Sequence, residues 1–424
     1  MAIIFKKPDN NIIKSTVCRG NCIGCGLCFS VCKQGAISMR RNWCGEIKPK
    51  IDKKKCINCA KCVKFCPNSK GNIKELIDKI SSSEPKHAYG LQNAKYYLAW
   101  HNDDNQRMKC CSGGAVTKLA QYLLENKIID GMIHVERLWG RRGDLHYGAR
   151  MSTTIDEINE HVSSAYQQID FSKVLEQIEE NKTYFMTGTP CVIRGIKKIF
   201  SEDKKFSKSK IMTCALVCSH NTNAQVIDYL TLINELCEKK SWKVDIRHKD
   251  NSIKDANNFK NLIYTDNEIL LNKNRFESGW THIWRNYYFA MEACLKCPDF
   301  WGVEADISIK DAWGEWASDP KGKSLVVIRS TQLEEYFLNS GIIQEELSYD
   351  DLKNHQSATS IYKQTQAYNK NYKSIFSRSN RKNLLLKYFI ISKSSKFLYK
   401  FFGYNITRMV MILVEKIALW SEKI

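Results

Sequence analysis

Two cysteine runs near the beginning of the chain constrain its folding more than any other feature of the sequence. They read Cys22-Ile-Gly-Cys25-Gly-Leu-Cys28-Phe-Ser-Val-Cys32 and Cys56-Ile-Asn-Cys59-Ala-Lys-Cys62-Val-Lys-Phe-Cys66. Both have the spacing C-x2-C-x2-C-x3-C, which puts three thiols on one tight loop and a fourth at the start of the next helix. That spacing is typical of 4Fe–4S clusters, so it predicts a small module that holds two of them.

The fourth cysteine of each run is expected to cross to the other cluster, as in bacterial two-cluster ferredoxins. The predicted ligands are Cys22, Cys25, Cys28 and Cys66 for one cluster, and Cys56, Cys59, Cys62 and Cys32 for the other. Zinc is the alternative metal, because C-x2-C pairs also bind zinc. The unbroken series of four cysteines in each run favours the clusters.

Charge and composition bound the location and the partners. The first eight residues lack a secretory signal, and no apolar run reaches the ~18 residues of a membrane span. With 18 cysteines, this indicates a cytoplasmic protein whose thiols bind metal or stay reduced. The net charge of +20 gathers at the ends, with 16 Lys/Arg against 4 Asp/Glu in residues 1–75 and 12 against 2 in residues 369–424. No zinc-finger or RNA-binding signature accompanies it, so nucleic acid is not an expected partner.

The middle of the chain reads as an α/β domain. A strand-like stretch at 96–100 leads to Ser112-Gly-Gly and a helix, which Ser112 is expected to cap. Unpaired N–H groups in the first turn of that helix would attract phosphate. A strand at 183–187 then runs into Gly188-Thr-Pro and a second helix, with Pro190 near its start.

A third unit has a strand at 211–217, a loop Cys218-Ser-His220 and a helix that ends near Cys237. Strands that alternate with helices predict ligand-binding loops at the carboxyl ends of the strands. Further along, a strand-like stretch starts at Ala305 and leads into Lys310-Asp311.

The order of these motifs resembles the coenzyme F420 hydrogenase/dehydrogenase beta-subunit family. The motifs that carry the resemblance are Ser112-Gly-Gly-Ala-Val-Thr117, Gly188-Thr-Pro-Cys191, Cys218-Ser-His220, Cys294-Leu-Lys-Cys297-Pro-Asp299, Ala305-Asp-Ile-Ser308 and Asp311-Ala-Trp-Gly314. Ser164-Ala-Tyr166 and the stretch 322–329 add to it, and together they cover about residues 15–345. The resemblance implies an iron–sulfur flavoprotein that passes electrons between clusters, FAD and a hydride-type substrate. Members of the family also occur in bacterial polysaccharide gene clusters.

The resemblance also implies the residues that would hold FAD. Ser112, Gly113, Gly114 and Thr117 would contact its phosphate or ribose, and Thr187, Gly188, Thr189 and Pro190 would border the flavin. The glycines would equally serve tight turns between strands and helices. A flavin agrees with the chemistry, because clusters move single electrons while the reduction of an organic substrate usually takes two.

Four more cysteines, Cys191, Cys218, Cys294 and Cys297, would complete a third 4Fe–4S site if their loops meet. A free thiol pair and a zinc site are the alternatives for Cys294 and Cys297. His220, Tyr166, Lys310 and Asp311 are candidates for proton handling or substrate contact, because they lie in or beside the matched motifs. No Gly-x-Gly-x-x-Gly fingerprint occurs, so reduced ferredoxin or another protein is the expected electron donor.

The C-terminal segment mixes apolar clusters with Lys and Arg from Asn369 onward. This pattern is typical of helices that lie on a membrane surface, and packing on the core or on a second copy of the chain is the alternative. The expected architecture is therefore an α+β multidomain chain. It consists of a two-cluster 4Fe–4S ferredoxin domain at residues 1–75, an α/β FAD domain at 76–345 and a basic helical tail at 346–424.

Two other function classes stay open beside an iron–sulfur/FAD oxidoreductase with a small-molecule substrate. One is a non-catalytic electron-relay subunit of a larger complex, and the other is a redox-sensing iron–sulfur protein. Flavin content separates them, because a sensor needs no flavin. The oligomeric state and the substrate do not follow from the sequence.

Overall fold

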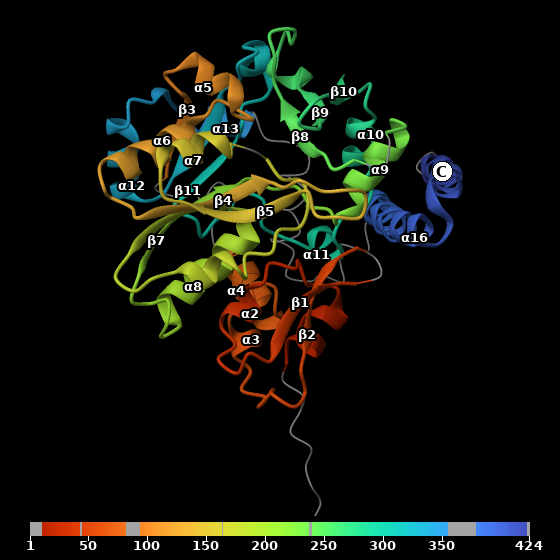
Figure 1. Cartoon of the computed structure of the whole chain (residues 1–424), viewed down its shortest axis with the longest axis horizontal. Helices are drawn as coiled ribbons and strands as arrows, with labels where there is room; N and C mark the ends of the chain where they lie inside the picture. Colours follow the sequence, from red (N-terminus) through yellow and green to blue (C-terminus); the bar gives the residue numbers. More distant parts are fainter. Residues whose placement is uncertain are drawn as a thin grey trace, which may run out of the picture.

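The computed structural model describes residues 11–42, 45–81, 94–162, 164–236, 240–354 and 379–421. In Figure 1 the N-terminal module lies below a large sheet, a smaller sheet lies beside that sheet, and the last helix packs at one side. Cys44, Cys237 and residues 82–93 lie outside the described residues.

The N-terminal module is a short antiparallel hairpin surrounded by small helices. Its elements are α1 (Ile12–Ser15), η1 (Val17–Arg19), α2 (Leu27–Ser30), β1 (Ile37–Arg41), β2 (Ile47–Ile51), α3 (Lys61–Lys64) and α4 (Lys70–Ser81). Each cysteine loop ends in a left-handed residue that starts a one-turn helix, Gly26 (φ 79°) before α2 and Ala60 (φ 60°) before α3. The second loop thus repeats the geometry of the first without its glycine.

An eight-stranded mixed sheet forms the centre of the molecule. Its order is β13-β3-β12-β11-β7-β6-β4-β5. The strands are β3 (Lys95–Trp100), β4 (Gly131–Arg137), β5 (Tyr147–Ser152), β6 (Thr183–Gly188), β7 (Lys210–Leu216), β11 (Ile307–Asp311), β12 (Ser324–Ile328) and β13 (Ile343–Leu347). The four central strands β11, β7, β6 and β4 are parallel, and the strands outside them pair antiparallel. The predicted strands at 96–100, 183–187 and 211–217 are confirmed, whereas the one expected from Ala305 begins at Ile307.

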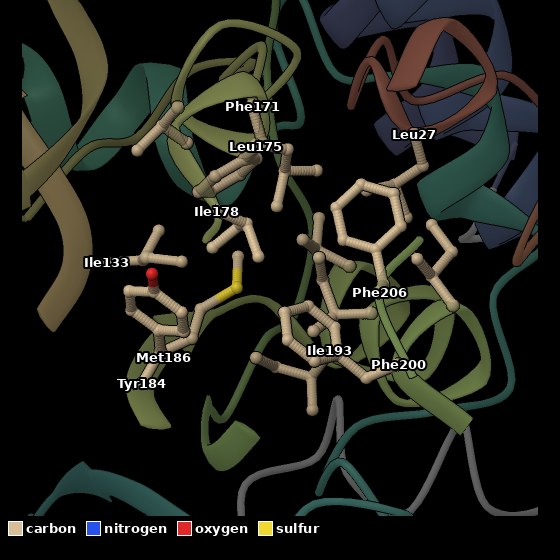
Figure 2. Packing of buried hydrophobic residues seen from close by; sticks show 14 of the residues in the cluster. Leu27, Ile133, Phe171, Leu175, Ile178, Tyr184, Met186, Ile193, Phe200 and Phe206 are labelled. Atoms are coloured by element: carbon tan, nitrogen blue, oxygen red, sulfur yellow. The ribbon is translucent and has the colours of Figure 1, made fainter. Parts of the chain in front are cut away.

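Helices cover both faces of this sheet. They are α5 (Asp104–Lys109), α6 (Ala115–Glu125), α7 (Ile155–Glu160), η2 (Val174–Gln177), α8 (Pro190–Glu202), η4 (Gly314–Ser318), α12 (Thr331–Asn339) and α13 (Tyr349–Asn354). Helix α8 packs its apolar face against the sheet on one side and against Leu27 of the N-terminal module on the other. Figure 2 shows Leu27 in the same buried cluster as Ile193, Phe200 and Phe206. One hydrophobic core therefore joins the first module to the central domain.

A three-stranded antiparallel sheet with order β10-β9-β8 stands beside the carboxyl ends of the central strands. Its elements and neighbours are α9 (Gln225–Ile233), β8 (Lys243–His248), η3 (Ala256–Asn258), β9 (Lys260–Tyr264), β10 (Ile269–Asn274), α10 (Trp280–Arg285) and α11 (Glu292–Leu295). Helix α9 ends at Ile233, earlier than expected, and Asn234 follows it as the C-cap.

The last described element, α16 (Ser379–Ser421), consists of two helices that meet at Gly403, whose φ of 66° and ψ of −163° are not helical. Among the described helices, none combines the length and apolar character needed to cross a membrane. Helix thus covers residues 379–421 of the segment that is expected to form a basic helical tail from residue 346 onward.

Candidate functional site

The N-terminal thiols gather in two groups whose members come from both cysteine runs. Burial raises the pKa of Cys25 well above its usual value, and the neighbouring thiols of Cys66 and Cys22 raise it further. Burial likewise raises the pKa of Cys62, and the thiols of Cys32, Cys59 and Cys56 add to this. The fourth cysteine of each run therefore lies beside the first three of the other run.

These two groups suit clusters, which bind thiolates and not thiols. Burial of Cys22, Cys25 and Cys28 raises the pKa of each, so a bound cation is needed to stabilise their thiolates. Zinc stays the alternative metal, because it too binds thiolates.

The second feature is a pocket of about 630 Å³ at the carboxyl ends of the four parallel strands. Thr187 at the end of β6, Val217 after β7 and Lys310 at the end of β11 line it from below. The first turn of α6 forms one side, and β8 with α10 forms the opposite side. Its position agrees with the general rule for ligands in open α/β sheets, and its size is that of a small-molecule site.

Most of the residues singled out in the sequence meet in this pocket. The lining includes Ser112, Gly114, Thr117, Tyr166, Thr187, Thr189, Cys218, His220, Lys310 and Asp311. These residues are spread over about 200 positions of sequence, and the parallel order of the strands brings them together.

Three of the predicted flavin contacts lie behind the pocket and do not line it. A Cβ atom at Gly113 would stand 2.7 Å from the Ala99 oxygen and 2.8 Å from the Ser324 nitrogen, so this glycine lets a loop pack against two strands. Gly188 packs on Ile193 of α8, and Pro190 is the buried first residue of that helix. The close packing of Gly113 is what a tight turn, the alternative for this glycine, requires.

The expected cap of α6 is wrong. Gly114, with φ of 78°, precedes the helix, and no side chain caps it. Ser112 instead donates to the Lys323 oxygen at 3.0 Å, because the loop before α6 packs on β12. The first turn of α6 lies at the pocket, where Ala115 and Thr117 line it, and no side chain caps the N–H groups of this turn.

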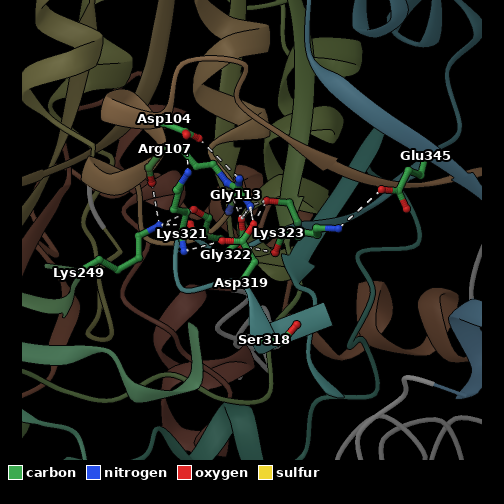
Figure 3. A network of polar contacts seen from close by, with 12 residues as sticks. Asp104, Arg107, Gly113, Lys249, Ser318, Asp319, Lys321, Gly322, Lys323 and Glu345 are labelled. Atoms are coloured by element: carbon green, nitrogen blue, oxygen red, sulfur yellow. Dashed lines mark hydrogen bonds and ion pairs between the residues drawn. The ribbon is translucent and has the colours of Figure 1, made fainter. Parts of the chain in front are cut away.

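A network of buried cations holds this loop in place. Lys249 donates to the carbonyl oxygens of Arg107, Ser112 and Lys321 at 2.7, 2.9 and 2.5 Å. Arg107 in turn donates to the Gly322 oxygen and to Asp319 (Figure 3). Burial lowers the pKa of Lys249 to about 8. Backbone carbonyls are therefore the main partners of a charged lysine here, and they fix the wall of the pocket.

The wall formed by β8 and α10 is strongly cationic. The Lys, Arg, Asp and Glu side chains of the lining are Arg247, Arg275, Arg285, Lys310 and Asp311, four cations against one anion. Asp311 is held by Arg247 through contacts of 2.6 and 3.0 Å. Burial lowers the pKa of Arg275, and Arg285 and Arg247 lower it further. This excess of positive charge favours an anionic ligand.

The same wall is aromatic. The His220 ring stacks between Trp284 and Tyr287, with ring centroids 3.8 and 4.2 Å away, and its Nδ1 lies 2.9 Å from the Ser219 hydroxyl. Tyr166 packs edge-on against Trp284 and accepts from Arg247 at 3.3 Å. His220 and Tyr166 are thus fixed in position by their neighbours, as a preformed binding surface requires.

Lys310 is the third of the predicted catalytic residues that line the pocket. Burial lowers the pKa of its ammonium to about 8, although Asp311 acts in the opposite direction. Its nitrogen lies 5.7 Å from the centre of the Trp301 ring. Lys310 therefore combines a place in the pocket with a pKa suited to proton transfer near neutral pH.

The four cysteines predicted to complete a third cluster have contacts in the core of the molecule. Cys191 lies close enough to Cys25 to affect its pKa. Cys218 lines the pocket, Cys294 accepts from the Asn221 nitrogen at 3.3 Å, and Cys297 donates to the Asp299 oxygen at 3.4 Å.

Helix α8 connects the cluster module with the pocket. Its N-cap Thr189 lines the pocket, and the hydroxyl of Thr189 lies 3.4 Å from the Cys191 sulfur in the first turn. One turn later, Arg194 donates to the Pro67 oxygen at 2.9 Å, directly after the last cysteine of the second run. A single helical turn therefore lies between Cys25 and the pocket.

The cationic and aromatic wall was missed by the sequence reasoning. Arg247, Arg275, Trp280, Trp284 and Arg285 fall in a stretch that carries no recognised motif. The density of Trp and Arg between 275 and 285 is the signal that would have indicated a binding surface, because these residues are common where ligands or partners are recognised.

The central domain matches two models that describe the two parts of one family. A model described as coenzyme F420 hydrogenase/dehydrogenase, beta subunit N-term, matches residues 96–176, and one that describes the C terminus of the same beta subunit matches residues 181–354. Two models described as 4Fe-4S dicluster domains match residues 21–70 and 48–111. The N-terminal module is accordingly an iron–sulfur electron-transfer module.

Similar curated proteins include an uncharacterized protein of Methanocaldococcus jannaschii, MJ1349, 23% identical over 383 residues that cover 81% of this chain and 93% of that protein. A stretch of 52 residues is 42% identical to the B component of the Na(+)-translocating ferredoxin:NAD(+) oxidoreductase complex of Acetobacterium woodii, covering 12% of this chain and 14% of that protein. Among solved structures, a chain of the F420-reducing NiFe hydrogenase complex from Methanosarcina barkeri is 17% identical, with a TM-score of 0.46. The match covers 68% of this chain and 91% of that one.

Proposed function

Because the chain belongs to the coenzyme F420 hydrogenase/dehydrogenase beta-subunit family, we propose that it is an iron–sulfur flavoprotein oxidoreductase. Electrons would enter through the N-terminal clusters from a donor protein such as reduced ferredoxin. They would reach FAD in the central pocket and then a small organic substrate bound beside it.

The observation that carries this proposal is the position of α8. Its N-cap Thr189 lines the pocket, and Cys191 two residues later stands beside Cys25 of the cluster module. The hydrogen bonds of Arg194 to Pro67 and Asn68, at 2.9 and 3.0 Å, hold the module against the same helix. This contact between the cluster module and a helix that borders the pocket supports electron transfer from the clusters to a ligand in the pocket.

The pocket residues fit FAD. The first turn of α6 offers unpaired N–H groups for a diphosphate, and Thr117 adds a hydroxyl there. Thr281 Oγ1 and Arg275 Nε are buried in the lining and have no hydrogen-bond partner among the described residues. Bound in this pocket, FAD would supply the conversion between the single-electron steps of clusters and the two-electron reduction of a substrate.

The chain itself would bind the substrate, exclude water and supply a proton. Trp280 and Trp284 form an apolar face, and Arg275 and Arg285 favour a ligand with a carboxylate or phosphate. Lys310 Nζ is the proposed proton donor, since its pKa of about 8 keeps both protonation states accessible. Acidic or phosphorylated sugars of polysaccharide synthesis are one substrate class with this chemistry.

An electron-relay subunit is the second candidate. The family description itself names a beta subunit, which implies that its members work beside other chains. Such a protein would hold the clusters and the flavin, and it would pass electrons to a partner protein without reducing a small molecule by itself.

A charge placed at the α6 turn tests the flavin site. Thr117→Asp puts a carboxylate where the diphosphate would lie, and we expect flavin occupancy after anaerobic purification to fall at least about tenfold. Thr117→Asn has nearly the same shape without the charge and should keep its flavin. Gly113 is unsuitable for this test because any side chain there would collide with β3 and β12.

Equal flavin content in both Thr117 variants would place the diphosphate elsewhere. Absence of flavin from the native chain, with full iron content, would instead support a redox-sensing protein. Flavin that is reduced by ferredoxin but passes electrons only to a partner protein would favour the electron-relay role.

A further inference from the structure

One face of α16 is attached firmly to the rest of the molecule. The Lys396 ammonium donates to Glu46 of the cluster module at 2.7 Å, and the Ser395 hydroxyl accepts from the Phe289 nitrogen at 3.1 Å. Burial alone would raise the pKa of Glu46, but Lys396 and Lys48 outweigh it and lower that pKa. Ile391 and Met411 are buried in the same cluster as α9 and the small sheet. The packing predicted as the alternative for this segment is therefore present.

The opposite face of α16 exposes large apolar side chains on both sides of the kink at Gly403. They are Ile390, Phe397, Phe401, Phe402, Ile406, Met409, Ile412 and Leu413, and we call them the α16 apolar surface. Phe401 is 60% exposed and Met409 is 72% exposed. Fourteen large hydrophobic residues are exposed in the described parts of the chain, and these eight form the majority.

The spacing of six of these residues puts them on one side of each helix. Positions 390, 397 and 401 of the first helix, and 406, 409 and 413 of the second, are three, four or seven residues apart or sums of these steps. The rings of Phe397 and Phe401 lie 4.7 Å apart between centroids. Each of the two helices thus carries an exposed apolar stripe, and exposed apolar patches mark interaction sites in soluble proteins.

Cations accompany the apolar surface. Lys393, Lys400 and Arg408 are exposed on the same helices, and residues 369–424 hold 12 Lys/Arg against 2 Asp/Glu. A two-fold contact with a second copy would bring these like charges together, which is unfavourable. An apolar stripe flanked by cations matches the interface of an anionic bilayer, where the apolar side chains enter the headgroup region and the cations meet lipid phosphates.

We propose that the α16 apolar surface binds the surface of a membrane that contains anionic lipid. The two helices would lie in the plane of the interface, since none of the described helices is suited to cross a bilayer. The packed face of α16 would keep the cluster module and the central domain attached to the membrane. This inference rests on α16 alone and does not depend on the flavin or on the substrate.

Flotation with vesicles tests the proposal on the full-length protein. We expect binding to phosphatidylcholine vesicles that contain phosphatidylglycerol, weaker binding to pure phosphatidylcholine, and a loss of binding as salt is raised. The double variant Phe401→Ser, Met409→Ser should weaken vesicle binding at least about tenfold. Lys400→Glu and Arg408→Glu should each weaken it at least about fivefold.

Matched variants on other surfaces serve as controls. Ile269→Ser removes an equally exposed apolar side chain from β10, and Lys254→Glu reverses an exposed charge. Both should bind vesicles like the native chain, and unchanged iron content and thermal unfolding would show that every variant is folded.

Two results would overturn the proposal. One is equal vesicle binding by the native chain and the Phe401→Ser, Met409→Ser variant. The other is no vesicle binding by the native chain, together with an oligomer in sedimentation that this variant converts to a monomer. The second result would identify the surface as a contact between copies of the chain.

Discussion

The cluster module and the ligand pocket are built in opposite ways. The predicted cluster ligands fall between residues 22 and 66, on two loops that repeat the same local geometry. The pocket takes its lining from Cys110 to Ser324 and exists only where four parallel strands end beside a separate small sheet. A site whose residues lie close together in the sequence can be predicted from their spacing. A site whose residues come from several strands can be predicted only when the strand order is known.

The largest expected effect concerns the cluster module, in which the fourth cysteine of each run is predicted to bind the cluster of the other run. The native chain should carry about eight iron atoms, four for each cluster, and about twelve would require a third cluster. Cys22→Ala, Cys66→Ala should lose one cluster, because both residues serve the same one. Cys56→Ala, Cys66→Ala should damage both clusters. Iron and acid-labile sulfide are measured after anaerobic isolation, and Cys18→Ala is the control.

The opposite pattern would contradict the crossing. If Cys56→Ala, Cys66→Ala kept one intact cluster, each run of four cysteines would bind its own cluster. The loops would then be two independent sites and not one interlocked module.

A substitution at the contact between the cluster module and α8 is expected to have a smaller effect. A Cβ atom at Gly195 of α8 would lie 2.4 Å from Leu27 Cδ1 and 3.1 Å from Pro67 Cδ. We expect Gly195→Ala to lower the free energy of unfolding by about 1–3 kcal/mol and to slow electron transfer from the module to the pocket. Thermal unfolding and rapid-mixing reduction of the flavin by reduced ferredoxin measure the two effects.

The control is Gly71→Ala, at a helical position where an added Cβ has nothing within 4 Å. It should be neutral or stabilise by up to about 1 kcal/mol, because alanine favours the helix. Equal effects of the two substitutions would mean that the module does not dock on α8.

The smallest expected effect is on the free energy of unfolding of the central domain, and it depends on pH. Burial lowers the pKa of His134 and of His146 to about 4, below the ordinary value of 6.5. The unfolded chain therefore binds more protons between pH 6.5 and 4, and the free energy of unfolding falls as the pH falls through that window. Each histidine should contribute a loss of about 1 kcal/mol between pH 7.5 and 5.5.

Anaerobic thermal unfolding at these two pH values measures the loss. His146→Phe should flatten the dependence, since a phenyl ring keeps the stacking on Trp242 and takes up no proton. An unaltered pH slope in His146→Phe would show that acid acts on other groups, for example on the clusters.

The sequence predicted what depends on neighbours along the chain. The cysteine spacing, the strands β6 and β7 and the start of α8 at Pro190 follow from local patterns, and the structure contains them. Ser112 was expected to cap α6, but its hydroxyl bonds to Lys323, more than 200 residues away, and Gly114 takes its place. The Trp and Arg residues from Arg275 to Arg285 indicate a binding surface, but nothing local places β8 and α10 at the strand ends.

The hydrogen bond between Lys396 and Glu46 joins residues 350 positions apart. At the usual rate of about 5–20 residues per second, a ribosome needs roughly 20–70 s to make the chain between them. The Glu46 carboxylate must therefore lack its Lys396 partner during most of synthesis. Iron and sulfide can reach the cysteine loops in that interval, before α16 attaches to the cluster module through Lys396. Delivery of the clusters would then be a step that belongs to translation, ahead of the completed fold.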